Sequence, residues 1–482
     1  MVGRIVAIGM RASTVPEVGQ GVQELANPKV YGRFADEGCG KDVAYIVLHP
    51  AVNFWNHYLV EPLNARKRAI LALKNPHERL AQLRASAHPQ AQLVWSVFRD
   101  VFHYAAFHLV AIADNARDVD LAIRWGFGWT QGPFETWQAA GFGDVAAWIR
   151  DDIAAGRTLA AAPLPAWVDD PQVAAAHGVH TPEGAWSPQR ATFVGRSSLP
   201  VYRRQRFPDA TVAERFAQGT TMFETDALRM WHLEGDVGIV SFKTKQNTIG
   251  SDVLDGLGRA LDLAEAQCAG LVLWQTREPF SLGANLASLA PAVQAGQWSV
   301  VEDIVARFQQ MSMRLRYSFV PTVAAVRGMA LGGGCELTMH CDRAVVAFET
   351  YIGLVEAGVG LLPAGGGSKE FAIRAVDDVA LGHAGGQQDA FPFIRSYFQN
   401  IAMAKVAKSA LDAKALGYLR ASDVVVMNAS ELLHVALAEA RALAEAGYRP
   451  PLPRTAIAVT GQTGIATLQM LLVNMREGGY IS

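Results

Sequence analysis

The chain has 482 residues, half of them apolar, and its 43 basic and 45 acidic residues give a formal net charge of −2. This length predicts about two to four domains with sizeable hydrophobic cores. The balanced charge argues against a nucleic-acid partner or an anionic membrane surface, and no apolar run reaches the ~18 residues that span a bilayer. Four scattered cysteines do not suggest a disulfide framework, so we expect a cytoplasmic protein.

Residues 1–85 form an N-terminal α/β segment to which the sequence assigns no role. Its first strand candidate, GRIVAIGM, is not followed by the G-x-G-x-x-G spacing and acidic residue that a dinucleotide-binding unit needs. No NAD site is therefore predicted in this segment.

Helical patterns follow. Apolar residues at helical spacing predict a long helix over 91–114. A second helix is expected next, with Asp118 near its start and Gly126 and Gly128 at its end. Five aromatic residues in this region are expected to pack in a core: Trp125, Phe127, Trp129, Phe134 and Trp137.

Residues 157–224 are predicted to be an irregular linker. The Pro- and Ala-rich stretch Ala160–Pro171 and the segment His180–Ala210 both lack a clear period. A basic cluster of Arg203, Arg204 and Arg206 lies in the second of them. It has two open interpretations, a solvated surface or attraction of a phosphate-bearing ligand.

After Thr225 strands alternate with helices, which predicts an α/β architecture. The strands are expected at GDVGIVSFK, AGLVLWQ, FVPTVAAVRG and DRAVVAF. The continuous apolar run of AGLVLWQ is typical of a strand buried on both faces. Ser251 is expected to cap a helix, and VVEDIVARFQQMSMRLRY predicts an amphipathic one.

Three consecutive glycines stand in GMALGGGCELTMHCD, which runs from Gly328 to Asp342. A strand is expected to end at Gly328, and Ala330 to Gly334 to turn tightly into a helix beginning near Gly333 or Gly334. The first N–H groups of a helix have no internal partner and its N-terminus is partly positive, so this turn suits developing negative charge. Glu336 follows Gly333 by three residues and should lie on the same side of the helix.

Two further segments extend this pattern. Glu356 lies in an apolar loop before a second glycine run, where a cap or an ion-pair partner is the alternative to a catalytic role. In EPFSLGANLASL, the backbone N–H of Ala284 offers a second donor. The phosphate-loop pattern G-x-x-x-x-G-K-[ST] is absent, and the spacing of Cys335, His340 and Cys341 disfavours a zinc site, so no metal is expected.

The stretches LGANL, GMALGGGCEL and VEAGVGLLPAGGG resemble, in order and spacing, the crotonase (enoyl-CoA hydratase/isomerase) superfamily. The resemblance implies a crotonase-type ββα spiral over residues 225–482. It implies Glu336 and Glu356 as the catalytic pair and the N–H groups of Ala284 and Gly333 as the oxyanion hole. The residues expected to contact substrate are Ser281, Leu282, Gly283, Leu286 and Gly332. Two positions depart from the family pattern, with Asn285 in place of Asp and Val355 in place of Pro.

The resemblance implies hydration of 2-enoyl-CoA to 3-hydroxyacyl-CoA in fatty-acid β-oxidation. Water would add at C3 and a proton at C2 through enolate-like charge on the thioester oxygen. Two catalytic carboxylates favour a hydratase over a double-bond isomerase. An acyl-CoA substrate, no cofactor and a homo-oligomer are expected, while a thiolase partner and the acyl chain length are left open.

The stretch Ile112–Gly141 is similar to the C-terminal helical domain of 3-hydroxyacyl-CoA dehydrogenases, with the pattern D-x-D-x-A-x-x-x-G-x-G-x-x-x-G-P-F-E. Bacterial β-oxidation fusion enzymes join such a domain to a crotonase domain. The resemblance implies a mainly helical dehydrogenase-like domain over 86–156, without its NAD domain. LHPAVNFW (Leu48–Trp55) is rejected as the dehydrogenase histidine motif, because no cofactor site precedes it.

Two alternatives to a hydratase remain. The chain could be part of a 3-hydroxyacyl-CoA dehydrogenase fusion enzyme, which would need NAD bound by a separate domain. It could also be a non-catalytic acyl-CoA-binding or scaffold subunit.

Overall fold

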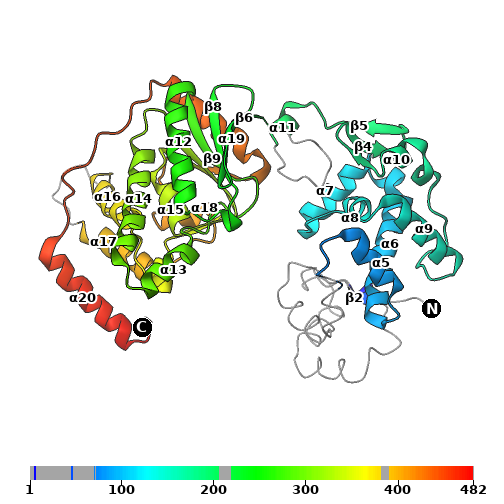
Figure 1. Ribbon diagram of the computed structural model, residues 1–482, viewed down its shortest axis with the longest axis horizontal. Coiled ribbons are helices and arrows are strands. Elements are labelled where there is room, and N and C mark those ends of the chain that lie inside the picture. The colour runs from blue at the N-terminus through cyan, green and yellow to red at the C-terminus, as the bar shows by residue number, and fades with distance from the viewer. Residues whose placement is uncertain are drawn as a thin grey trace. The chain divides into compact units, whose positions relative to one another are not determined.

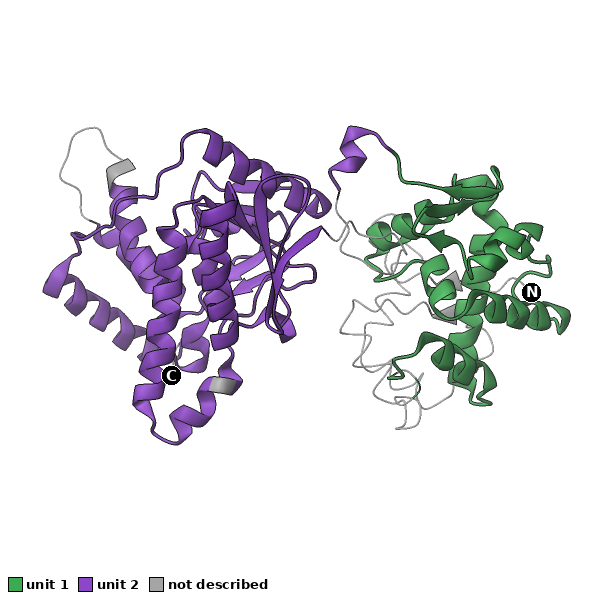
Figure 2. Cartoon of the chain, turned by 45° about the horizontal axis from the view of Figure 1, so that its top comes forward, with its two compact units in different colours: residues 1–197, 209–215 green, residues 198–208, 216–482 purple. Residues whose placement is uncertain are grey.

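The computed structural model describes residues 5–6, 45–46, 70, 72–205, 219–381 and 390–480. The chain divides into two compact units, residues 1–197 with 209–215 and residues 198–208 with 216–482 (Figure 2). The division falls inside the segment 157–224. In residues 1–69, only the parallel pair β1 (Ile5–Val6) and β2 (Tyr45–Ile46) is described, so the motif Leu48–Trp55 lies outside the described residues, as does Arg206.

The main helices described in unit 1 (Figure 1) are α5 (Pro76–Ala85), α6 (Pro89–Ile112), α7 (Ala116–Phe127), α8 (Pro133–Ala139) and α9 (Phe142–Ala154). The long helix predicted over 91–114 is confirmed by α6. The prediction that Gly126 stops α7 is wrong, because a glycine costs only about 1 kcal/mol inside a helix. The helix ends at Gly128, which adopts the left-handed conformation with φ 67°.

The five aromatic residues predicted to pack in a core differ in burial, and Trp129 is half-buried. Phe134 and Trp137 are fully buried, and Trp137 stacks on Phe142 with a ring-centroid distance of 4.4 Å. Trp125 and Phe127 are 63% and 58% exposed, so the prediction of core packing is wrong for these two. The reason is that the buried positions of α7 all lie in its first half, and its last turn extends beyond the core.

The segment predicted to be irregular is largely ordered in its first part, which corrects that prediction. It forms η2 (Ala166–Asp169), α10 (Pro171–Ala175) and an antiparallel sheet of β3 (His180–Thr181), β4 (Gly184–Ser187) and β5 (Thr192–Val194). The strands are short and every residue of β4 is buried, so no alternating pattern marks them. Beyond them, α11 (Pro200–Arg203) carries Arg203, which is exposed together with Arg204.

A buried aspartate connects this small sheet to the helices. Asp120 of α7 accepts hydrogen bonds from the N–H groups of Phe134 (2.8 Å) and Glu135 (3.2 Å) at the start of α8. Its other contact is with Nε2 of His180 on β3, at 2.6 Å. Asp120 therefore fixes three elements of unit 1 around one carboxylate.

Unit 2 is built on a seven-stranded sheet with the order β14-β12-β10-β9-β8-β7-β6. Strands β6 to β8 are antiparallel neighbours, and β8, β9, β10, β12 and β14 are parallel. The strand bounds are β6 (Thr220–Glu224), β7 (Leu228–His232), β8 (Val237–Phe242), β9 (Gly270–Trp274), β10 (Thr322–Val326), β12 (Arg343–Ala347) and β14 (Val424–Val426). All residues of β9 are buried, which confirms the prediction of a strand buried on both faces; the residues of the predicted strands β8 and β10 are all buried as well.

The two faces of the sheet pack against different helices. Leu271 and Leu273 of β9 join the core that includes α12 (Ser251–Gln267), whereas Val272 faces α19 (Leu432–Glu445). This alternation follows from the two-residue period of a strand. Ser251 is the first residue of α12 and not its cap; Gly250 is the cap residue, and its carbonyl accepts the N–H of Leu254.

A second, two-stranded sheet positions the glycine run. β11 (Met329–Leu331) pairs in parallel with β13 (Tyr351–Gly353), and α15 (Gly333–His340) follows β11. The predicted helix start at Gly333 is confirmed, but Ala330 and Leu331 belong to β11 and not to a turn. They pair with Ser281 as well, because Leu331 N–H donates to the Ser281 carbonyl at 3.0 Å.

Further helices described in unit 2 are α13 (Leu286–Gln294), α14 (Trp298–Arg316), η5 (Glu356–Val359), α16 (Gly367–Leu381), α17 (Phe391–Ala402), α18 (Ala410–Ala415) and α20 (Gly461–Glu477). Within the described ranges, none of the helices combines the length and apolar character that crossing a membrane requires.

Candidate active site

Two glycine turns bring a pair of backbone donors together. Gly283 has φ +87°, and a Cβ placed on it would lie 2.7 Å from the nitrogen of Gly333. The nitrogen of Ala284 lies 3.4 Å from the position of a Cβ on Gly333. In the part of the chain that the structure describes, neither the Ala284 nor the Gly333 N–H donates to an acceptor, whereas both N–H groups flanking Ala284 do. These two donors are therefore adjacent and available to a ligand.

The turn at 281–285 is held by its own hydrogen bonds. The hydroxyl of Ser281 donates to the Asn247 carbonyl at 2.7 Å and accepts the Gly283 N–H at 3.0 Å. Ser281 is fully buried, and both of these bonds lie within the protein. The structure thus places the predicted substrate contact Ser281 beneath the turn.

Asn247 is a residue that sequence reasoning missed. Its side-chain amide donates to the carbonyls of Pro279 (2.7 Å) and Arg277 (3.1 Å), so it fixes the chain that enters the turn. Gln246 and Asn247 both have left-handed backbones, with φ 58° and 51°. The only sequence signal is that asparagine tolerates this conformation better than most residues.

Glu336 lies in the first turn of α15 and is 4% exposed. Its Oε1 accepts the N–H of Gly367 at 2.9 Å, and a Cβ on Gly365 would lie 2.5 Å from its Oε2. Burial, together with the nearby charge of Glu356, raises the pKa of Glu336 to about 8. The second glycine run thus lets a backbone donor approach a buried carboxyl group that holds its proton at neutral pH.

Glu356 opens η5 and is half-buried. Its Oε2 is buried without a hydrogen-bond partner among the described residues, and its Oε1 lies 3.2 Å from the position of a Cβ on Gly332. Burial raises the pKa of Glu356 as well. The preceding residue, Val355, has φ −106°, outside the range that proline permits, so the loop departs from the proline-containing family pattern in conformation too.

The other predicted contacts lie around the same turns. Leu282 is half-buried, Gly332 is buried at the N-cap of α15, and Leu286 is 45% exposed at the start of α13. Asn285 caps α13 by accepting the Ala287 N–H at 3.2 Å, so asparagine performs a capping role at this position.

Cys335, His340 and Cys341, whose spacing disfavours a zinc site, make contacts within the protein or are buried in its core. His340 contacts the Glu336 carbonyl through Nδ1 at 2.6 Å and Lys369 Nζ through Nε2 at 3.0 Å. Cys335 and Cys341 are fully buried. Within the described ranges, no group of three or more His, Cys, Asp or Glu side chains is placed to hold a metal ion.

This geometry of paired donors and paired carboxylates coincides with a family match. Residues 234–380 match the family described as "Enoyl-CoA hydratase/isomerase". Unit 2 carries a crotonase domain. The crotonase resemblance of GMALGGGCEL and its companion stretches is thereby confirmed.

Most of the chain is also similar to parts of longer proteins. A "Probable 3-hydroxyacyl-CoA dehydrogenase" of Bacillus subtilis (strain 168) is 32% identical over 391 residues, which are 81% of this chain and 47% of that protein. A Rickettsia felis protein, provisionally named a "fatty acid oxidation complex trifunctional enzyme", is 26% identical over 62% of this chain and 37% of its own length. The chain thus spans about half or less of these relatives. Their names confirm the predicted resemblance to β-oxidation fusion enzymes.

Among solved structures, an enoyl-CoA hydratase from Bacillus anthracis is 21% identical, covers 52% of this chain and 91% of its own, and has a TM-score of 0.37. An enoyl-CoA hydratase from Thermoplasma volcanium GSS1 is 18% identical over 53% of this chain and 94% of its own, with a TM-score of 0.38.

Proposed function

We propose that this protein hydrates 2-enoyl-CoA thioesters to 3-hydroxyacyl-CoA in fatty-acid β-oxidation. One observation carries the proposal. The N–H groups of Ala284 and Gly333, which have no acceptor among the described residues, lie together in the same crotonase domain as Glu336 and Glu356, two carboxyl groups whose pKa values burial raises.

The mechanism uses only groups of this chain and water. The two N–H groups donate hydrogen bonds to the thioester oxygen and stabilise the enolate-like charge that develops on it; losing one such donor typically costs ~100–1000-fold in rate. The carboxyl pair shares one proton near neutral pH, because two close carboxylates resist double ionisation. One carboxylate takes a proton from water as its oxygen bonds to C3, and the other carboxyl group delivers a proton to C2. The reaction needs neither a cofactor nor a metal, and coenzyme A enters as part of the substrate.

A second candidate follows from the relatives' names. The chain would then be part of a larger 3-hydroxyacyl-CoA dehydrogenase fusion enzyme, with NAD bound by a separate domain. The absence of G-x-G-x-x-G from the sequence speaks against NAD-dependent turnover by this chain alone.

The test is hydration of crotonyl-CoA, followed by loss of the conjugated thioester absorbance. We expect turnover by the parent, and losses of at least ~100-fold in kcat for Glu336→Gln and Glu356→Gln with crotonyl-CoA still bound. Glu302→Gln, an exposed position on α14, serves as the matched control and should retain parent activity. If the parent binds crotonyl-CoA without turning it over, the hydratase proposal fails and a non-catalytic acyl-CoA-binding subunit becomes the better interpretation. NAD-dependent oxidation of 3-hydroxybutyryl-CoA would support the second candidate.

A further inference from the structure

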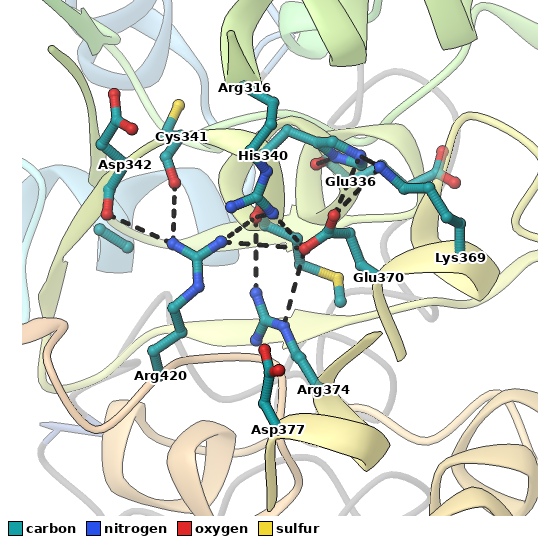
Figure 3. Close-up of polar contacts among 12 residues, drawn as sticks. Arg316, Glu336, His340, Cys341, Asp342, Lys369, Glu370, Arg374, Asp377 and Arg420 are labelled. Carbon is teal, nitrogen blue, oxygen red and sulfur yellow. Dashed lines mark hydrogen bonds and ion pairs between the residues drawn. The ribbon is translucent and has the colours of Figure 1, made fainter. Parts of the chain in front are cut away.

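A buried carboxylate with no place in the hydration chemistry lies behind the site. Glu370, in the first turn of α16, is 1% exposed and is surrounded by cationic side chains (Figure 3). Lys369 Nζ lies 3.1 Å from it, His340 Nε2 3.7 Å, Arg420 3.8 Å and Arg374 4.0 Å, and Arg316 is in direct contact. Burial would raise the pKa of Glu370, but the charges of Arg316, Arg374 and Lys369 hold it at about 2. His340 is a neutral member of this group near pH 7, because burial lowers its pKa to about 4.

The same arginines bind the C-terminal end of α15. The carbonyl of Met339 accepts hydrogen bonds from Arg420 (2.8 Å), Arg316 (3.1 Å) and Arg374 (3.5 Å), and Arg420 also bonds the Cys341 carbonyl at 3.0 Å. The last carbonyls of a helix lack partners and carry partial negative charge, so guanidinium groups stabilise this end. The opposite end of α15 presents the N–H of Gly333.

Glu370 connects this arginine cluster to Glu336. The N–H of Glu370 donates to the Gly366 carbonyl at 2.9 Å, in the turn whose Gly367 N–H bonds Glu336 at 2.9 Å. A Cβ on Gly366 would lie 2.5 Å from the His340 ring, so the start of α16 and the end of α15 meet closely. Glu336 is therefore held between two helices that Glu370 and the arginines fasten together.

We propose that Glu370 is a positioning residue, which fixes the first turn of α16 against α15 and so keeps the Gly367 N–H on the Glu336 carboxyl group. The proposal rests on the proposed function in one respect, that Glu336 takes part in hydration. Arg316, Arg374 and Arg420 act with Glu370, since each contacts both its carboxylate and the end of α15.

The first experiment is Glu370→Gln in the full chain. The variant keeps the shape of the side chain and leaves the buried cations without their counter-charge. We expect kcat for crotonyl-CoA hydration to fall about tenfold to hundredfold, since small displacements of a catalytic group have effects of this size. KM should change less than about threefold, because the donors Ala284 and Gly333 are left in place. Glu370→Asp, which retains the charge, should recover part of the lost kcat.

Amide hydrogen exchange of the segment 363–371 gives a second readout that does not depend on activity. In Glu370→Gln, exchange at Gly367 should accelerate at least about tenfold while the segments of unit 1 stay unchanged. If the parent has no hydratase activity, the proposed function fails and this measurement still decides the positioning role. The proposal is overturned if the folded Glu370→Gln variant has the kcat of the parent and the same protection from amide exchange. It is also overturned if protection falls uniformly across unit 2, because Glu370 would then stabilise the whole unit and not the turn at Gly367.

If Glu370→Gln does not fold, the Arg420→Lys variant tests the positioning role instead. It retains the charge and removes the forked contact between Glu370, Met339 and Cys341, and we expect the same pattern of lower kcat and faster exchange at Gly367. The matched control is Arg441→Lys, whose guanidinium pairs with Asp236 at the surface at 3.3 Å and which should behave as the parent. Parent-level kcat and exchange in Arg420→Lys would overturn the positioning role.

Discussion

At the scale of single residues, Glu336 combines two demands that oppose each other. The carboxyl group is nearly inaccessible to water, which raises its pKa to about 8, and yet one backbone N–H at 2.9 Å favours its charged form. A group with these properties destabilises the folded chain as it ionises, because the unfolded chain ionises it at a much lower pH.

This conflict predicts that Glu336→Gln stabilises unit 2 at high pH. The folded-state pKa is raised from 4.5 to about 8, so the parent loses stability as pH rises through this interval. The total loss is roughly 3–5 kcal/mol, and the glutamine variant, which does not titrate, escapes it. Thermal unfolding of both proteins between pH 5 and pH 8 should show a difference that grows with pH. A constant difference would mean that Glu336 ionises normally in the folded protein.

The same carboxyl pair predicts the pH dependence of turnover. Hydration requires one proton on the pair, and the last proton leaves as pH rises through the pKa of Glu336, about 8. We therefore expect kcat to decline above about pH 8, tenfold per pH unit at the limit. The pH profile of crotonyl-CoA hydration under saturating substrate measures this directly, and a flat profile to pH 10 would exclude a shared proton.

Ser281 is the residue at which sequence and structure suggest different roles. A substrate contact predicts that Ser281→Ala raises KM, whereas a hydroxyl that supports the turn predicts lower kcat. Because both hydrogen bonds of the hydroxyl lie within the protein, we expect about a tenfold loss in kcat with KM nearly unchanged. Steady-state kinetics of Ser281→Ala distinguishes the two roles, with Ser422→Ala, at an exposed position, as the control.

At the scale of elements, the donor pair depends on a turn that tolerates no side chain. Gly283 has φ +87° and approaches the Gly333 nitrogen, so Gly283→Ala adds both strain and a steric conflict. We expect kcat to fall at least ~100-fold, the loss typical of one missing oxyanion donor. Gly258→Ala in α12 is the matched control, since the added methyl would meet only the flexible end of Met311 at 3.4 Å. If Gly283→Ala keeps the kcat of the parent, the two glycine turns do not take part in the hydration reaction.

The elements that the sequence predicts well are those with a strong local signal. The apolar runs of β8, β9 and β10 predict strands, that of β9 predicts burial on both faces, and the glycine run predicts a helix start near Gly333 or Gly334, which the structure places at Gly333. The short strands β3 to β5 carry no such signal, because their burial comes from packing against the helices of unit 1. The left-handed backbone of Gln246 and Asn247 could not be predicted from the sequence either, because Asn247 acts through hydrogen bonds to a loop 30 residues away.

The site itself could be predicted only in part. Glu336, Glu356 and the two donors lie in recognisable stretches, and their placement as catalytic residues remains a prediction. The arginine cluster could not be anticipated, because Arg316 of α14, Glu370 of α16 and Arg420, which lies between α18 and β14, come from three separate parts of the chain and meet only in the folded unit. Long-range ion pairs leave no local periodicity.

At the scale of the whole molecule, the two units have separate hydrophobic cores. Trp137 belongs to the core of unit 1, while Leu271 and Val272 belong to the two cores of unit 2. We therefore expect Trp137→Ala to lower the stability of unit 1 by about 3–5 kcal/mol and to leave kcat within twofold of the parent. Calorimetry of the variant should resolve two unfolding transitions, one for unit 1 at a lower temperature than in the parent and one for unit 2 at the same temperature. A joint shift of both, or a loss of activity, would mean that the units are energetically coupled.

Both candidate oxyanion donors lie on segments that follow neighbouring parallel strands, Ala284 after β9 and Gly333 after β10 and the short strand β11. The pairing of Leu273 with Ala324, continued by the pairing of Ser281 with Ala330, therefore sets the separation of the two donors. A slip of one residue would move one donor by about 3.3 Å relative to the other, beyond hydrogen-bonding tolerance, and would exchange the faces that meet α12 and α19. A compact chain with this single pairing error would retain its secondary structure and lose the ability to hold a thioester oxygen. Specific activity would then report the fidelity of strand pairing in a preparation, which circular dichroism cannot distinguish.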